Sequence, residues 1–377
     1  LEGIKMNSNF KDITIYLSEI PELQNYYSTF GSSGLDDYVC ELVMIAGLCH
    51  DLGHGPFSHV FDDLYLKDKL ISNKHHETRS CKMISSIIKN HPILSTIIMP
   101  DEIHFIQNLI DPKLDHNNFI YQIISNKLNG IDVDKFDYLS RDTKMLGLKY
   151  GFDHTRFVSD AKVISNKVCF PEKILYEIIS MFKTRYRLHK QIYNHKSVVS
   201  IQFMLRDIME LMDDKLEISK KVDTMKDFHI LTDEYILNIT KFLKNKSDIK
   251  IKTANELIER IEHRKIYKFI NSLIVSNQIK PKYINNIINS NPNVFVFSCK
   301  INFGLKSNPL ENIFLYNTKS GHLVKPKSKD IISLWKIYQE YLYYFYQIEC
   351  DKDDENYENY EKIYNEIEEL EIKLEKK

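Results

Sequence analysis

An apolar segment that runs directly into a cluster of ionisable side chains constrains the fold of this chain most. Residues 39–49 (VCELVMIAGLC) are apolar almost all round, which predicts a helix buried in a core. Within the overlapping segment 47–63 (GLCHDLGHGPFSHVFDD), the thirteen positions 50–62 then hold five ionisable side chains, namely His50, Asp51, His54, His59 and Asp62. The glycines and the proline between them predict that the helix ends at this cluster.

Such a cluster is poorly suited to a hydrophobic core, because an unpaired buried carboxylate costs free energy. A lone histidine is more often a structural residue than a metal ligand. Imidazole nitrogens and carboxylate oxygens together, however, form a ligand set that suits Fe, Mn, Zn or Mg. The adjacent pair His50 and Asp51, with further histidines after it, therefore predicts a metal site.

A second segment, 129–142 (NGIDVDKFDYLSRD), carries polar side chains at helical spacing. Asp134, Tyr138 and Asp142 follow one another every four residues, so a helix would place them on one face, with Lys135 one step around it. This face is a candidate binding surface. Taken alone, the segment is explained equally well as a solvated charged face.

A third segment, 184–196 (TRYRLHKQIYNHK), repeats the pattern with Arg185, His189, Tyr193 and Lys196. An arginine guanidinium matches the geometry of phosphate oxygens, and histidine and tyrosine can hydrogen-bond a phosphate or a base. The segment is a candidate phosphate-binding face, and a solvated surface again explains it equally well by itself.

Most of the chain has the apolar periodicity of helices. The pattern predicts helices over 80–89, 102–110, 118–128, 132–146, 171–196, 197–219, 231–244 and 253–273. Residues 294–301 and 312–317 alternate and predict a small sheet. A last helix is predicted to start near Asp330 and to carry Trp335, Tyr338, Tyr341 and Phe345. The acidic end of the chain has a short heptad seam, which fits either a coiled coil or a helix that packs on its own domain.

Composition limits the class of protein. A net charge of −1 gives no basic field for nucleic-acid binding. The six cysteines are scattered without a CxxC pair, which favours reduced thiols inside a cell. We see no signal peptide and no run of about 20 apolar residues, so we expect a soluble intracellular protein with no membrane span, in the cytoplasm or the nucleus.

Together these motifs resemble those of the HD-domain metal phosphohydrolases, which bind one metal through a His, a His-Asp pair and a distant Asp. The phrases IAGLCHDLGHGPFSH and SNKLNGIDVDKFDY are similar to the deoxynucleoside triphosphate triphosphohydrolases of the SAM-and-HD-domain type, and the similarity runs from about Phe10 to Tyr346. We expect no SAM domain within these residues. The resemblance implies a mainly α-helical fold, with an HD-type metal-phosphohydrolase core (1–280), a small C-terminal α+β lobe (281–350) and an acidic helical tail (351–377).

The resemblance also implies roles for individual residues. His50, Asp51 and Asp134 match positions that bind a divalent metal (Fe, Mn, Zn or Mg), and an additional Mg is expected on the nucleotide. His76 matches the general acid that protonates the departing deoxyribose oxygen, with a surface histidine beside His75 as the alternative. Other catalytic positions are matched by His54, His59 and Asp62. Positions around the phosphates and the sugar are matched by Lys135, Tyr138, Asp142, Arg185, His189, Tyr193 and Asn194.

Nucleotide activation and assembly into a homodimer or homotetramer are implied in the same way. The activator would be GTP or dGTP together with a dNTP. The matching positions are Arg156, Lys173, His195, Lys196, Arg264, Lys268 and Lys327. Pro171 stands where the family has an arginine, and each cation taken singly is also explained as a solvated surface charge.

The pattern departs from the family at one place. The first metal-ligand histidine should lie upstream of Gly47, in a phrase that resembles RFEHSLG, and no histidine precedes His50. A segment is therefore missing near Gly31. It is absent only from this sequence, was removed by shortening the chain through a GSSG-like junction, or has been lost from the natural protein, and these three explanations stay open.

The leading hypothesis is metal-dependent hydrolysis of dNTPs to a deoxynucleoside and inorganic triphosphate, which controls dNTP pools. Two alternatives stay open. One is an HD phosphohydrolase that acts on another nucleotide. The other is a catalytically inactive nucleotide- or RNA-binding regulator, which the missing histidine favours.

Overall fold

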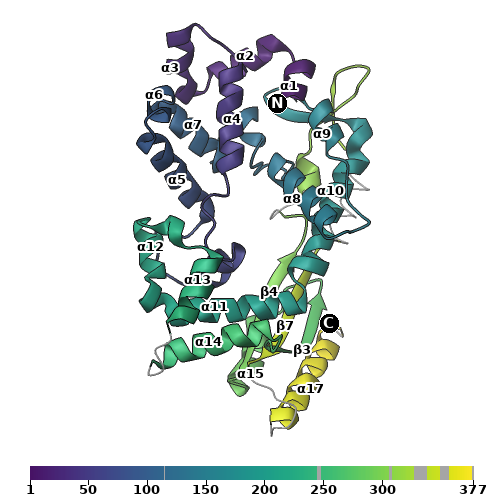
Figure 1. Cartoon of the computed structure of the whole chain (residues 1–377). Helices are drawn as coiled ribbons and strands as arrows, with labels where there is room; N and C mark the ends of the chain where they lie inside the picture. Colours follow the sequence, from purple (N-terminus) through teal and green to yellow (C-terminus); the bar gives the residue numbers. More distant parts are fainter. Residues whose placement is uncertain (114, 244–247, 305–307, 327–337, 349–355, 376–377) are drawn as a thin grey trace. The chain divides into compact units, whose positions relative to one another are not determined.

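A computed structural model describes the chain except for residues 114, 244–247, 305–307, 327–337, 349–355 and 376–377. Helices dominate the described residues (Figure 1), which confirms the predicted mainly α-helical fold. The chain divides into two compact units, each built from separate stretches of sequence. The first unit comprises Leu1–His54, His75–Leu188 and Phe303–Ile337, and the second comprises Gly55–Lys74, His189–Asn302 and Tyr338–Lys377. The boundaries expected after residues 280 and 350 stay a prediction.

The first unit is a helical assembly with a small sheet. Its helices are α1 (Glu2–Asn7), α2 (Phe10–Ser18), α3 (Pro21–Phe30), α4 (Asp37–Cys49), α5 (His76–Asn90), α6 (Leu94–Ile97), α7 (Pro100–Ile110), α8 (Val133–Met145), α9 (Thr155–Asp160) and α10 (Leu175–Leu188), with short turns η2 (Phe119–Gln122), η3 (Glu172–Ile174) and η6 (Pro309–Asn312). Its sheet has the order β1 (Lys162–Ile164), β2 (Lys167–Pro171), β5 (Leu315–Tyr316) and β6 (Leu323–Val324).

Helix α7 organises the core of this unit, because α3, α4 and α5 all pack against it. Its residues Phe105, Ile106 and Leu109 are fully buried, and their spacing of one, three and four positions gives the helix a continuous apolar stripe. Helix α8 packs separately on α10. The elements that carry the candidate site residues of this unit, α4, α5, α8 and α10, are thus each fixed by packing.

The second unit is built around one long helix. Its helices are α11 (Lys196–Leu216), α12 (Ile218–Thr224), α13 (Asp233–Phe242), α14 (Ile249–Glu262), α15 (Pro281–Ser290) and α17 (Asn356–Glu375), with short turns η1 (Phe61–Tyr65), η4 (His189–Tyr193) and η5 (Phe228–Ile230). Its antiparallel sheet has the order β3 (Lys268–Val275), β7 (Glu340–Gln347) and β4 (Val294–Ile301). Helix α11 contacts α12, α13, α14 and β3.

The C-terminal helix α17 packs on the sheet of its own unit beside β3 (Figure 1). Ile363, Ile367 and Leu370 lie in one apolar cluster with Leu273 and Phe345 of the sheet. Of the two interpretations of the C-terminal heptad seam, the structure supports the helix that packs on its own domain.

Among the helices that the structure describes, none combines the length and the apolar composition that a membrane span requires.

Helix α4 confirms the helix predicted over residues 39–49, but it is less buried than predicted. Val39, Leu42 and Ala46 are fully buried, whereas Met44 is 60% exposed and Leu48 is 84% exposed. The prediction that this helix is buried on all sides is therefore wrong, because the described residues cover only one of its apolar faces.

The predicted helix 118–128 is wrong beyond the short turn Phe119–Gln122. Side chains bind the backbone there instead. Asp132 Oδ2 accepts the N–H of Asn126 at 2.9 Å, and Asn126 Oδ1 accepts the N–H of Leu128 at 3.0 Å. Asparagine and aspartate side chains compete in this way with helical hydrogen bonds.

Two long predicted helices are shorter than expected. The segment 171–196, predicted as one helix, forms a regular α-helix only over Leu175–Leu188. Strand β2 extends to Pro171 and pairs with β5, so the helix cannot begin there. The prediction 253–273 ends at Glu262, since Arg264 has a left-handed φ of 56° and strand β3 follows.

The last predicted helix is wrong where the structure describes it, because Glu340–Gln347 form the middle strand β7. This segment, EYLYYFYQ, is rich in aromatic residues, which are typical of strands. Residues 330–337, with Trp335, lie outside the described residues. The strand predicted at 294–301 is confirmed as β4, whereas 312–317 contributes β5 to the other sheet, so these two segments do not share a sheet.

Replacement of a buried residue of α17 should destabilise the protein. We expect Ile367→Ala to lower the free energy of unfolding by about 2–5 kcal/mol, the usual range for a buried isoleucine, because its side chain is fully buried. Ile372 on the same helix is 50% exposed, so Ile372→Ala is the matched control and should change that free energy by less than about 0.5 kcal/mol. Denaturant unfolding of the full chain measures both, and equal effects would contradict the packing.

Candidate metal centre

The C-terminal end of α4 positions the first histidine of the cluster. His50 directly follows the last helical residue, Cys49, and its Nδ1 lies 2.7 Å from Gly47 O. Since a carbonyl oxygen only accepts, this contact places the proton on Nδ1 and leaves the Nε2 lone pair of the neutral ring available to a ligand.

Helix α8 brings a distant aspartate to this ring. Asp132 caps α8 by accepting the N–H of Lys135 at 3.0 Å, which places Asp134 in the first turn. Asp134 Oδ1 lies 3.4 Å from His50 Nε2, although 84 positions separate the two residues in the sequence. Asp51 Oδ2 lies 3.4 Å from the same nitrogen. The structure therefore brings His50, Asp51 and Asp134 together.

One nitrogen and two carboxylates at a single point suit a divalent cation. The three ligand atoms lie within 4.8 Å of one another. The side-chain hydrogen bond to Asp134 is the main reason why the pKa of His50 rises to about 9, and the charge of Asp51 adds to it against the opposing effect of burial. Two carboxylates that favour a positive charge on an imidazole also favour a metal cation. The donor set fits the metal that an HD domain implies.

A second group of possible ligands shares Asp51. Its Oδ1 lies 3.5 Å from His54 Nε2, and the ring of His54 stacks on that of His76 at a centroid distance of 4.0 Å and an angle of 14°. Burial pushes the pKa of Asp51 up, but the hydrogen bond with His54 and the charges of His50, His54 and His76 together outweigh burial and hold this pKa below its usual range. Glu77 Oε2 lies 3.5 Å from His76 Nδ1. These side chains form a continuous polar group from α4 to the start of α5.

Further predicted residues of the first unit lie on α8 and α10. Lys135 Nζ lies 3.0 Å from Asp132 Oδ2. Burial lowers the pKa of Lys135, but the charge of Asp132, the hydrogen bond to it and the charges of Tyr138 and Asp134 together outweigh burial and raise this pKa. Burial raises the pKa of Tyr138, while the charges of Arg185 and Lys135 oppose that rise. The electrostatic influence on Tyr138 indicates that the two cations lie near this phenol.

The backbone at Gly304 lies against the guanidinium of Arg185. Gly304 has a φ of 99°, and a Cβ there would stand 2.8 Å from Arg185 Cζ and from Arg185 Nε. A side chain at position 304 would therefore displace the guanidinium. Asp142 lies two turns along α8 from Asp134, where its Oδ1 is 3.8 Å from Arg141 Nε.

The remaining predicted catalytic and substrate residues belong to the second unit and are described within it. Asp62 is buried in η1, whereas the side chain of His59 is 73% exposed. In η4, the rings of His189 and Tyr193 meet edge to face at 5.0 Å, and Asn194 Nδ2 donates to His189 O at 2.8 Å.

The residues predicted to bind an activating nucleotide are divided between the units. Lys196 and Lys268 line one hollow of about 280 Å³ in the second unit, with Tyr267 and Phe269. Lys196 Nζ lies 4.9 Å from the ring centroid of Phe269. The second unit also contains His195 and Arg264, the first unit contains Arg156 and Lys173, and Lys327 lies outside the described residues.

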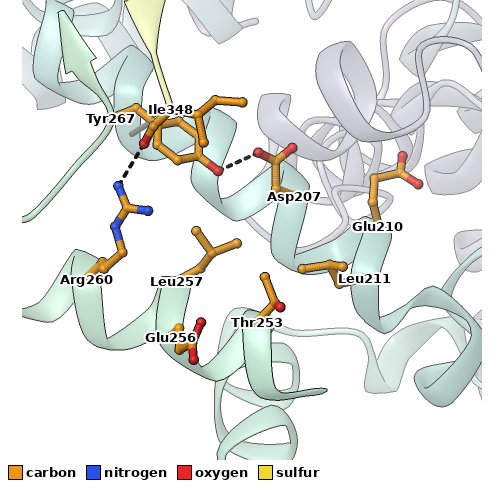
Figure 2. A pocket seen from close by; sticks show the side chains of 9 residues that line it. All are labelled: Asp207, Glu210, Leu211, Thr253, Glu256, Leu257, Arg260, Tyr267 and Ile348. Atoms are coloured by element: carbon orange, nitrogen blue, oxygen red, sulfur yellow. Dashed lines mark hydrogen bonds between the residues drawn. The ribbon is translucent and has the colours of Figure 1, made fainter. Parts of the chain in front are cut away.

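The sequence interpretation missed a larger hollow of about 380 Å³ between α11 and α14 (Figure 2). Its polar groups bind one another: Tyr267 donates its hydroxyl to Asp207 at 2.7 Å, and Arg260 donates to Ile348 O at 3.1 Å. The lining comprises Asp207, Glu210, Leu211, Thr253, Glu256, Leu257, Arg260, Tyr267 and Ile348. Helical periodicity alone does not distinguish such a lining from a solvated face.

The interpretation also missed Asp132, which both caps α8 and pairs with Lys135. The available signal was an aspartate at the first position of the helix predicted over 132–146, since aspartate is a preferred N-cap.

Comparison with known proteins agrees with this geometry. A family model described as the HD domain matches residues 39–142, which include His50, Asp51 and Asp134. An HD domain-containing protein of Acanthamoeba polyphaga mimivirus is 39% identical, over 75% of this chain and 66% of its own length.

Several further relatives carry names that state an activity, including one of Dictyostelium discoideum and one of human. The deoxynucleoside triphosphate triphosphohydrolase SAMHD1 homolog of Dictyostelium discoideum is 36% identical, over 78% of this chain and 59% of its own length. The human deoxynucleoside triphosphate triphosphohydrolase SAMHD1 is 35% identical, over 65% of this chain and 44% of its own length. The chain thus spans less than two thirds of the length of these relatives. The HD domain matches the segment in which His50, Asp51 and Asp134 lie close together. Together with these similarities, that match shows that the chain belongs to the HD-domain family, among the relatives of SAMHD1.

Proposed function

We propose that this chain is a metal-dependent hydrolase that splits dNTPs into a deoxynucleoside and inorganic triphosphate. The observation that carries the proposal is the meeting of His50, Asp51 and Asp134 within the segment that matches the HD domain. Relatives at 35% and 36% identity that are named deoxynucleoside triphosphate triphosphohydrolases support this choice of substrate.

His50 Nε2 and the carboxylates of Asp51 and Asp134 would hold the divalent cation. When bound, such a cation polarises a phosphate and makes water a better nucleophile at neutral pH. The Nδ1–H contact with Gly47 O orients the ring of His50, and the helical first turn of α8 orients Asp134. Catalytic metal sites commonly have three protein ligands and keep a position open, so this donor set is consistent with catalysis.

Loss of Asp134 should remove the metal. Purified Asp134→Ala protein should contain much less bound divalent metal than the wild type, because one of two carboxylates in the set is lost. Asp137→Ala is the matched control, since Asp137 lies on the same helix with a side chain that is 67% exposed. Elemental analysis of the two proteins decides the assignment, and equal metal content in wild type and Asp134→Ala would rule it out.

The first unit also offers groups for the substrate. Arg185 would bind phosphate oxygens, since its guanidinium donates in a fixed fork, and Lys135 keeps a raised pKa and hence its charge. Tyr138, near both charges, and Asp142 are assigned to the phosphates and the sugar by the resemblance. The resemblance also assigns His189, Tyr193 and Asn194 to the substrate, and His59 and Asp62 to catalysis.

His76 is our candidate for the general acid. It begins α5, and its stack on His54 at 4.0 Å places it in the polar group that includes Asp51. A histidine titrates near neutrality, so it can deliver a proton to the departing deoxyribose oxygen.

The identity of the product tests the substrate class. Incubation of the full chain with dGTP or dATP and Mn²⁺ should release inorganic triphosphate as the first product, which phosphorus NMR resolves from pyrophosphate and phosphate. Stepwise release of single phosphates would instead support an HD phosphohydrolase for another nucleotide. Binding of nucleotide or RNA without any turnover would support the inactive regulator.

Kinetics should separate proton donation from phosphate binding. His76→Ala should lower kcat by about 10²–10⁴-fold, the usual size of general acid catalysis, with little change in substrate affinity. Arg185→Ala should weaken both affinity and kcat, because its charge acts on bound substrate and on the transition state. Turnover and nucleotide binding are measured side by side, and a near wild-type rate in His76→Ala would move the acid to His54 or His59.

The hollow lined by Lys196 and Lys268 supports a second, regulatory role for nucleotide. Two cations and the aromatic faces of Tyr267 and Phe269 suit a phosphate and a base. We propose this hollow for the activating GTP or dGTP. The homodimer or homotetramer expected from the resemblance stays a prediction.

A further inference from the structure

The turn that carries the metal-ligand pair is bonded at two points to helix α5. Ser80 Oγ donates to His50 O at 2.6 Å and accepts the N–H of Gly53 at 2.8 Å. Arg79 Nε donates to Gly53 O at 2.7 Å. The beginning and the end of the turn His50–Gly53 are thus both held by adjacent residues of one helix.

Gly53 lets the two backbones touch. A Cβ at this position would stand 2.1 Å from His76 O, 2.4 Å from Ser80 N and 2.8 Å from Arg79 Cβ. No side chain fits in that space without moving the turn or the helix. The contact therefore sets the position of the first turn of α5, where His76 begins the helix, relative to the turn that carries Asp51.

Arg79 and Ser80 are both fully buried at this contact. A buried arginine is unusual, because its charge must be matched by hydrogen bonds, and an aliphatic residue would fill the same space at lower cost. The hydrogen bond that Arg79 makes to the Gly53 carbonyl gives this residue a specific task. Ser80 has a task of the same kind, because its hydroxyl bonds to backbone groups at both ends of the turn.

We infer that Arg79 and Ser80 are positioning residues, which hold the His50–Asp51 turn in the geometry that binds metal and keep His76 beside it. The inference rests on the proposed function in that it takes His50 and Asp51 as metal ligands. Groups that orient metal ligands typically contribute 10–100-fold to metal affinity or activity, so the loss of either hydrogen-bonding residue should be measurable on that scale.

The test uses metal-free full-length protein titrated with Mn²⁺ by calorimetry. Ser80→Ala removes both hydroxyl bonds with a small change in volume and should weaken Mn²⁺ binding by about 10–100-fold. Arg79→Lys keeps a cationic donor and should retain more affinity than Arg79→Met, which keeps only the apolar bulk. Ile84→Ala is the matched control. Ile84 is buried on the same helix, and its apolar side chain cannot form a hydrogen bond to the turn.

Thermal unfolding of each variant separates positioning from stability. Ile84→Ala should lose stability and keep wild-type Mn²⁺ affinity, whereas Ser80→Ala should lose affinity at an equal or smaller loss of stability. In a dGTP assay, Ser80→Ala should lower kcat with little change in KM. Wild-type Mn²⁺ affinity in Ser80→Ala and Arg79→Met would overturn the inference while leaving the metal site in place. Failure of the wild type itself to bind Mn²⁺ would overturn the metal assignment and this inference with it.

Discussion

The contact between His50 Nε2 and Asp134 Oδ1, at 3.4 Å, is the interaction on which the candidate site depends. It joins the C-terminal end of α4 to the first turn of α8. The C-terminal end of α4 favours positive charge, and the first turn of α8 favours the negative charge of Asp134, so both helix ends suit a cation held between them. The helix ends thus reinforce the attraction that raises the pKa of His50 to about 9.

The chemistry of the site could be predicted from the sequence better than its surroundings. Motif spacing singled out His50, Asp51 and Asp134 because liganding residue types are rare next to one another in a core, and the structure brings these three together. The same reasoning missed Arg79 and Ser80. Their role depends on backbone groups of the turn, and backbone contacts between distant segments leave almost no pattern in the side chains of a single sequence.

The fold could be predicted as a class but not in each element. Apolar periodicity identified α4 and α11, whose buried residues recur at helical spacing. It placed a helix over Glu340–Gln347, where the aromatic residues instead form a strand between two others. Tertiary contacts decide between helix and strand here. An aromatic run fits either structure until β3 and β4 offer backbone hydrogen-bond partners on both edges.

The segment before α4 brings no histidine to the candidate metal site. Tyr27 donates its hydroxyl to Gly34 O at 2.7 Å, and Asp36 caps α4 by accepting the N–H of Val39 at 2.8 Å, so the chain passes from α3 to α4 through a hydrogen-bonded turn. No histidine precedes His50 in this sequence, and among the described residues the group of His50, Asp51 and Asp134 contains no second imidazole that could compensate for a displaced ligand. With three candidate ligands at two helix ends, metal affinity would be sensitive to the orientation of each one. The bonds that Arg79 and Ser80 make to the turn therefore act at the point where this site has the least redundancy.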